Sequence, residues 1–395
     1  MNILSMDKTA IRALKSQESW RYTDLNRLFD VDWELTENHA LPIVKLDPEI
    51  TDFMDNDLLT HIDIINGIAA FDFSKLPDGV HIEHKMDGAR ADDAHPLNAA
   101  ENAAIQPGII ITIRENTHIA LPLLLNFYGN GNGLPQKGSF VSAPVITLNV
   151  KQGASLSLVE YWHDEALKND VWTLPRFAVN LGAGAKLDWL RHSNLPSNHF
   201  ITARQSFSLE ANSRLDFKSH LRDQGFFRQE TDIHLKGEYA EAIFNGAYMA
   251  SNDAMIEHIT NIHHHAPNSN SEQIFHGIAD QSGQANFQAK IIVDQGADGT
   301  NANQQHKALL LSDNAQINAK PALEIYADAV KCAHGSSMGA LDPMQVFYLQ
   351  TRGIPYDQAR KMLIDGFLKA PLTAYEDDKE YLNNALHGLM NEGGV

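Results

Sequence analysis

The feature that most constrains the fold is a series of short segments within residues 106–340 in which apolar and polar residues alternate. Six of them read ASLSLVEYW, AKLDWLRH, SRLDFKSH, AEAIFNGAYM, ANFQAKIIV and AQINAKPALEIY. Aligning one apolar residue of each gives steps of 31, 28, 28, 44 and 30 residues along Leu156, Leu187, Leu215, Ile243, Phe287 and Ile317. Because alternation is the period of a strand and no helical pattern intervenes, the repeat predicts stacked strands rather than strand–helix–strand units. Two strands per coil would make a β-helix, and the spacing leaves a sandwich or a barrel open.

The regions on either side of the repeat have helical patterns. Apolar residues recur at helical spacing between residues 11 and 28, and the composition of 91–105 suggests a second helix. Beyond the repeat, residues 343–353 and 355–370 are helical by period, and each begins with a proline. We therefore expect an N-terminal mixed or helical domain at 1–105, a β core at 106–340 and a C-terminal helical domain at 341–395.

Composition limits the setting in which this chain works. It has 31 basic and 50 acidic residues, a formal charge of −19, so a nucleic-acid surface is not expected. Its single cysteine, Cys332, excludes a disulfide framework and suits a reducing cytosol. The N-terminus lacks a secretory pattern and no run of about 18 apolar residues occurs, so we expect a cytoplasmic protein without membrane association.

Short catalytic motifs are missing from the sequence. There is no GxxxxGK[ST], HExxH, GxSxG or CxxC pattern, and the glycine-rich stretch at 129–135 is interpreted as a loop. A histidine cluster, His258 with His263, His264 and His265, raises the question of a metal site. On a strand His263 and His265 share one face and His264 takes the other, so three ligands do not converge. The favoured interpretation is a half-buried, hydrogen-bonded strand end.

A long composite pattern near the C-terminus is more specific. The elements LLLSD, KPALEIYADAVKCAHG, LD…FYLQTRGI and AR…L…GF follow one another within 307–368, with WRYTDL at 20–25 and HHHAPNSNSEQIFHGI at 263–278. In this order and spacing they resemble the SufB/SufD family of iron–sulfur cluster assembly scaffold proteins. The length, the single cysteine and CAHGSS at 332–337 are most similar to the SufD branch.

The resemblance implies a mainly β fold, a right-handed parallel β-helix flanked by helical N- and C-terminal domains. It also implies a non-catalytic scaffold subunit that pairs with a SufB-like chain, binds a SufC-type ATPase and supports cluster assembly and iron acquisition. No cofactor is expected to bind stably to this chain alone, although iron or a cluster would be held transiently in the complex. The sequence leaves open whether the isolated chain forms a homodimer before it pairs with a partner.

Two alternatives come from different classes of protein. Many β-helices are polysaccharide lyases or hydrolases, which need acidic or basic residues converging on one exposed strand face. The sequence identifies no such set. A homodimeric structural protein without a cluster role is the other alternative.

Cys332 and His334 are the candidate metal residues. If one strand ran through LEIYADAVKCAHG, Glu324, Tyr326, Asp328, Val330, Cys332 and His334 would share a face. A thiolate and an imidazole are ligands that iron and zinc prefer, but two ligands do not complete a tetrahedral site. The resemblance implies a half-site at the partner interface, with His334 as ligand or proton-transfer group and Cys332 as auxiliary thiol. Without it, a buried cysteine beside a hydrogen-bonded histidine is the simpler interpretation.

The C-terminal helices carry the candidate partner-binding residues. Apolar side chains recur along both helices and must be buried on something. The alternative to partner binding is packing of the helices on each other and on the β core. The resemblance favours docking of the ATPase by Phe347, Tyr348, Leu349, Arg352, Ala359, Met362, Leu363 and Phe367. In WRYTDL, by contrast, Trp20 and Tyr22 are predicted to be structural.

Overall fold

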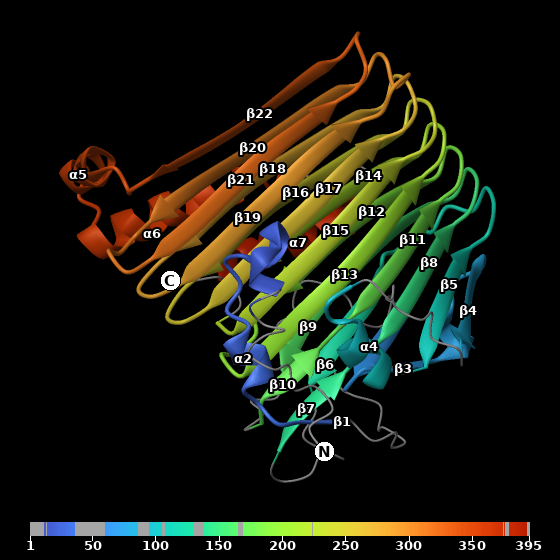
Figure 1. Ribbon diagram of the computed structural model, residues 1–395, viewed down its shortest axis with the longest axis horizontal. Helices are drawn as coiled ribbons and strands as arrows, with labels where there is room; N and C mark the ends of the chain where they lie inside the picture. The colour runs from blue at the N-terminus through green and yellow to red at the C-terminus, as the bar shows by residue number, and fades with distance from the viewer. Residues whose placement is uncertain are drawn as a thin grey trace.

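The computed structural model describes residues 12, 14–35, 60–85, 95–104, 107–129, 138–164, 169–222, 224–373, 375 and 379–392. Its main feature is a parallel β-helix built from two sheets, with helices packed against it (Figure 1). Sheet A consists, in spatial order, of β21 (Gln316–Ile325), β19 (Gln284–Val293), β17 (Met255–His264), β15 (Phe226–Leu235), β13 (His199–Leu209), β11 (Arg176–Leu181), β8 (Val145–Val150), β5 (Gly108–Ile113) and β4 (Val80–Lys85). Sheet B consists of β22 (Lys331–Gly339), β20 (Asn301–Leu310), β18 (Asn270–Ala279), β16 (Glu241–Ala250), β14 (Arg214–Leu221), β12 (Lys186–Ser193), β9 (Ser155–Asp164), β6 (Leu123–Gly129), β2 (Thr60–Ile65) and β3 (Ile68–Phe71).

Consecutive long strands alternate between the two sheets, so each coil contributes one strand to each. From β11 to β22 every strand pairs in parallel with the strand two places along the chain. The predicted β-helix is therefore confirmed, and the sandwich and barrel alternatives are wrong. Turns between strands use asparagine in the left-handed region, for example Asn212, Asn252 and Asn268 at φ 57°, 57° and 58°, which asparagine tolerates better than most residues.

The register between coils corrects the alignment of the repeat. Leu156, Leu187 and Leu215 do pair in successive coils of sheet B, but Leu215 then pairs with Ala242 rather than Ile243. Phe287 and Ile317 belong to sheet A, so the step of 44 residues crossed from one sheet to the other. The true sheet B column runs through Leu156, Leu187, Leu215, Ala242, Ser271, Ala302 and Cys332. The alignment relied on large apolar residues, whereas several positions of this column are alanine or serine, so the repeat could not be followed through them.

Residues near the N-terminus pack on the outer face of sheet A. They form η1 (Glu18–Trp20), α2 (Asn26–Phe29), β1 (Trp33–Leu35) and α4 (Asn98–Ala103), while the short strands β7 (Ser139–Ser142) and β10 (Val171–Thr173) pair with each other. A further short helix, η2 (Phe73–Lys75), lies between β3 and β4 in the chain. One cluster joins Trp20, Leu28 and Trp33 to Phe226 and Met255 of sheet A. Strands β2 and β4 extend the two sheets with residues from before position 106. The predicted loop at 129–135 lies outside the described residues, except for Gly129.

The WRYTDL segment is held by a buried arginine. The Arg228 guanidinium lies 3.5 Å from the centre of the Trp20 ring and donates to the Ser19 carbonyl (2.9 Å) and to Thr23 Oγ1 (3.0 Å). Trp20 is 1% exposed, whereas Tyr22 is 45% exposed. The tryptophan therefore has a packing role, and the tyrosine does not share it.

We expect Trp20→Ala to lower the free energy of unfolding by about 3–5 kcal/mol, because it leaves a cavity and removes a cation–π partner. Tyr22→Ala is the matched control and should change it by less than about 1 kcal/mol. Urea unfolding of both variants checks this. Equal midpoints for the two would contradict the packing role of Trp20.

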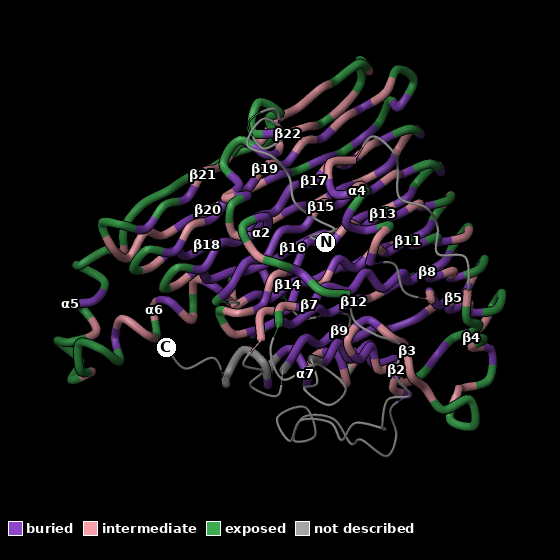
Figure 2. The backbone as a smooth tube through the Cα atoms, turned by 60° about the horizontal axis from the view of Figure 1, so that its bottom comes forward, coloured by how far each residue is buried: buried purple, intermediate pink, exposed green. Residues whose placement is uncertain are grey.

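The C-terminal helices are α5 (Pro343–Thr351), α6 (Tyr356–Lys369) and α7 (Glu380–Glu392), and the last two cover the outer face of sheet B. Ile364 and Leu368 of α6, with Leu382 of α7, join Leu190 and Ile278 of sheet B in one apolar cluster. α5 packs on α6 and projects beyond the sheets, and it is largely exposed (Figures 1 and 2). No helix in the described part of the chain is long and apolar enough to cross a bilayer.

Candidate metal half-site at the open end of the β-helix

The β-helix ends at β21 and β22 without a covering strand. Each is the last strand of its sheet, paired on one side only among the described residues, with β19 and β20 respectively. β21 has 10 residues and β22 has 9, so two long rows of backbone donors and acceptors face outward. Natural proteins usually shorten, charge or cover such edges. An edge of this length is suited to pairing with another chain.

Cys332 and His334 lie on this terminal strand, on the side that faces the space between the two sheets. Cys332 pairs in register with Ala302 and packs at the end of the central core, and His334 pairs with Gln304. Burial raises the pKa of the Cys332 thiol, an effect that a backbone hydrogen bond with Ala302 partly offsets. His334 is exposed. The two side chains lie about 7 Å apart along the strand, as residues two positions apart do.

Residues 324–334 do not form one continuous strand, so that expectation is wrong. Cys332 and His334 nevertheless share one face of a strand, as expected. β21 ends at Ile325 and β22 begins at Lys331, because the chain crosses there from sheet A to sheet B. Glu324 consequently lies on sheet A, where its carboxylate accepts from Lys290 Nζ at 2.7 Å. Cys332 and His334 share a face because both belong to β22.

Behind the half-site, the interior of the β-helix contains a group of buried polar side chains next to its apolar core. His306 lies one coil inward, with Nδ1 at 3.3 Å from Ser336 Oγ and Nε2 at 2.8 Å from the Tyr248 hydroxyl. Gln304 donates to Gln273 at 3.3 Å. Both ring nitrogens of His258, Gln273 Nε2 and Gln304 Oε1 are buried without a hydrogen-bond partner. Buried polar groups of this kind are commonly satisfied by internal water.

No short sequence motif predicts this group of buried polar residues. Its members come from different coils, about 30 residues apart, and look unrelated along the sequence. The signal that could have found them is a polar residue at an inward-facing strand position. That signal is usable only once the register is known.

The buried histidines make stability depend on pH. Burial lowers the pKa of His258 to about 3, and lowers that of His264 and of His306 to about 4, in each case with a smaller effect from neighbouring charges. The unfolded chain binds protons at these sites near pH 6.5, whereas the folded chain does not, so stability is full above pH 6.5 and is lost as the pH falls toward 4.

We therefore expect the urea midpoint to fall steadily between pH 6.5 and 4. His258→Gln should make the free energy of unfolding depend less steeply on pH, by an amount that corresponds to at most about one bound proton. His81→Gln, at a histidine whose side chain is 68% exposed, is the control for the substitution itself. A midpoint that stays constant over this range would contradict the assignment of these histidines as neutral and buried.

The eight predicted partner-binding residues fall into two groups. Phe347 and Tyr348 on α5 are 58% and 57% exposed, and Met362 is 48% exposed. Arg352 is exposed beside Tyr348, with its guanidinium 5.2 Å from the ring centre. The remaining four are buried or half-buried: Leu349, Ala359, Leu363 and Phe367.

The second group contributes to packing of the helices. Ala359 is fully buried. Phe367 stacks on His276 with ring centres 4.5 Å apart, and its carbonyl accepts from His276 Nδ1 at 2.7 Å. The packing alternative is therefore confirmed for this second group, whereas docking of a partner by the exposed group stays a prediction.

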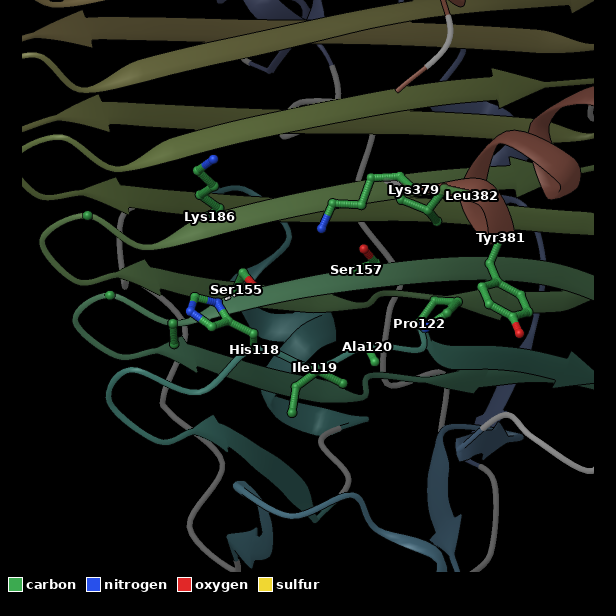
Figure 3. Close-up of a pocket in the computed structure, with 13 residues that line it drawn as sticks. His118, Ile119, Ala120, Pro122, Ser155, Ser157, Lys186, Lys379, Tyr381 and Leu382 are labelled. Atoms are coloured by element: carbon green, nitrogen blue, oxygen red, sulfur yellow. Dashed lines mark hydrogen bonds between the residues drawn. The ribbon is translucent and has the colours of Figure 1, made fainter. Parts of the chain in front are cut away.

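A separate cleft lies between α7 and the outer face of sheet B, near β9 and β12. It has a volume of about 460 Å³ and is lined by residues that include Ser157, Lys186, Lys379 and Tyr381 (Figure 3). Lys379 is already paired with Asp188 at 3.3 Å. None of the predicted site residues lines this cleft.

Comparison with known proteins identifies relatives of this chain. The family model for the SufBD core domain, described as SUF system FeS cluster assembly, matches residues 133–367, more than half of the chain. The chain is 31% identical over 235 residues to the iron–sulfur cluster assembly protein SufD of Escherichia coli, covering 58% of this chain and 54% of that protein. It is 27% identical over 399 positions to the chloroplastic protein ABCI7 of Arabidopsis thaliana, covering 95% and 82%. SufD of Bacillus subtilis is 24% identical over 285 residues, covering 71% and 63%. These matches give no support to a polysaccharide lyase or hydrolase.

Proposed function

The chain belongs to the SufBD family of iron–sulfur cluster assembly proteins, and from this premise we propose that it is a non-catalytic scaffold subunit of a cluster assembly complex. In the proposed complex it pairs with a SufB-like chain and binds a SufC-type ATPase. Iron or a nascent cluster is the cargo of the complex and is held only transiently. The single cysteine suits a reducing compartment, and we place the complex in the cytoplasm.

The observation that carries the proposal is the open end of the β-helix with two candidate metal ligands on its terminal strand. β22 offers an unpaired edge, and Cys332 and His334 lie beside it. A SufB-like strand added to this edge would continue the sheet by backbone hydrogen bonds. It would also cover the exposed side chains of β22 and supply the ligands that two residues cannot provide.

Co-expression of this chain with a SufB-like chain and a SufC-type ATPase tests the proposal. A complex of all three should co-purify under anaerobic conditions and contain iron and sulfide. The isolated chain should dimerise through the same edge, so a charged residue such as Ala333→Asp on β22 should weaken both assemblies. Purification of this chain free of both partners would contradict the scaffold role and favour a homodimeric structural protein.

We propose that α5 presents the surface that docks the ATPase. Its aromatic pair Phe347 and Tyr348 is exposed beside Arg352, and Tyr and Arg are enriched at the centres of protein interfaces. Deletion of residues 344–395 would be a poor test of this surface. It would also remove α6 and α7 and so expose apolar residues of sheet B that include Leu190 and Ile278. Point substitutions on α5 avoid this problem.

We expect Phe347→Asp combined with Tyr348→Asp to weaken ATPase binding by at least about 30-fold, which corresponds to about 2 kcal/mol for an interface hot spot. Tyr239→Asp, at a turn of the β-helix and 55% exposed, is the matched control and should not change binding. Surface plasmon resonance with the purified ATPase measures both. Undiminished capture by the double variant would place the docking surface elsewhere.

A further inference from the structure

Three histidines meet on the outer face of sheet A, away from the half-site. His263 at the end of β17 pairs in register with His234 of β15, the strand beside it. His265 follows directly after β17. One ring nitrogen from each residue can be chosen so that all three lie within 4.8 Å of one another. They form the one grouping of three or more such ligands found within the described residues.

The sequence contained only part of this arrangement. The prediction that His263 and His265 share a face and that His264 takes the other is confirmed, since His264 is buried and contacts Ser269 Oγ at 2.7 Å. The missing third ligand, His234, lies 29 residues before His263 and one coil away. Residues brought together by the stacking of coils have no fixed spacing along the chain.

Hydrogen bonds orient two of the three rings. His265 Nδ1 lies 2.6 Å from Asp294 Oδ2, which orients that ring so that Nε2 is the nitrogen directed at the other rings. His265 Nε2 is 3.0 Å from His234 Nδ1, so these two ligand atoms already point at each other. Asp232 also lies close enough to His263 to act on it electrostatically. These two carboxylates favour a divalent cation, and Lys236 and Lys290, which also act on these histidines, oppose it in part.

The backbone holds the three positions, while the side chains keep some freedom. His234 and His263 are anchored in neighbouring strands of a parallel sheet, and sites on strands are more exact than sites on loops. The rings are nearly parallel, with interplanar angles of 15°, 8° and 8°. Converging on one ion requires them to turn about χ2, and all three side chains are at least partly exposed.

We propose that His234, His263 and His265 bind one divalent transition metal ion of the kind that prefers imidazole, such as Zn²⁺. Three protein ligands leave one position of a tetrahedral site open to water or to an exchanging ligand. The proposal is independent of the scaffold role, because His234 and His263 lie on β15 and β17 of sheet A, three and two strands from its terminal strand β21.

The test is titration of the full-length, chelator-treated protein with Zn²⁺ by calorimetry, and with Co²⁺ by visible absorption. We expect one ion per chain at this site, with tetrahedral Co²⁺ bands. His234→Gln, His263→Gln and His265→Gln should each weaken Zn²⁺ binding at least tenfold, and Asp294→Asn should weaken it about tenfold through loss of ring orientation.

Two controls separate this site from other outcomes. The double variant Cys332→Ser with His334→Ala should keep the ion, which distinguishes this site from the half-site. His81→Gln, an exposed histidine elsewhere, should also keep it. Circular dichroism confirms that each variant is folded. Unchanged Zn²⁺ stoichiometry and affinity in His263→Gln, or no binding by the wild-type chain below about 1 mM, would overturn the proposal.

Discussion

Replacing His334 by alanine is expected to lower the iron content of the co-purified complex about tenfold or more, while the complex itself still assembles. The half-site offers two donors, so the loss of one imidazole leaves a single thiol, whose pKa is raised by burial. The fold should be unaffected because His334 is exposed on the terminal strand. Cys332→Ser should lower the iron content less, since we assign the thiol an auxiliary role.

The measurement is iron and sulfide content per complex after anaerobic purification. Ser337→Ala is the matched control, because Ser337 is also exposed on β22 but alternates to the other face. Its complex should retain the wild-type iron content. A wild-type iron content in the His334→Ala complex would contradict the half-site. Cys332 would then be a core residue at the end of the β-helix.

Replacing Glu160 by alanine is expected to lower the free energy of unfolding by about 3–5 kcal/mol. This carboxylate is fully buried inside the β-helix. It accepts from Trp162 Nε1 at 2.6 Å, from Trp189 Nε1 at 2.9 Å and from Arg191 Nη2 at 2.7 Å. Its loss leaves a guanidinium that is 1% exposed without its anion, and two indole donors without an acceptor.

A surface ion pair of the same length provides the control for Glu160. The carboxylate of Glu324 is also 2.7 Å from its partner, Lys290, but the two side chains are 42% and 39% exposed. Glu324→Ala should therefore cost less than about 1 kcal/mol. Urea unfolding at pH 7 compares the two. Equal losses would show that the interior pair contributes no more than a solvated one.

The C-terminal helices show which structural features could be predicted from the sequence and which could not. Proline at the start and apolar residues at helical spacing predicted α5 and α6, because capping and period are local properties. The same pattern could not separate Phe347, which is exposed, from Ala359, which is fully buried. Both sit on apolar stripes, and only the position of sheet B relative to the two helices decides which stripe is covered.

For the candidate sites, too, some features were predictable from the sequence and others were not. Alternation along a strand was enough to place Cys332 and His334 on one face, and the composite C-terminal pattern was enough to indicate the family. The sheet to which β22 belongs, the group of buried polar side chains behind His334 and the approach of His234 to His263 were decided by the tertiary structure alone. The physical reason is that the period of a strand is a property of a few neighbouring residues. The register between coils, by contrast, depends on the length of every turn and on how about 30 intervening residues pack.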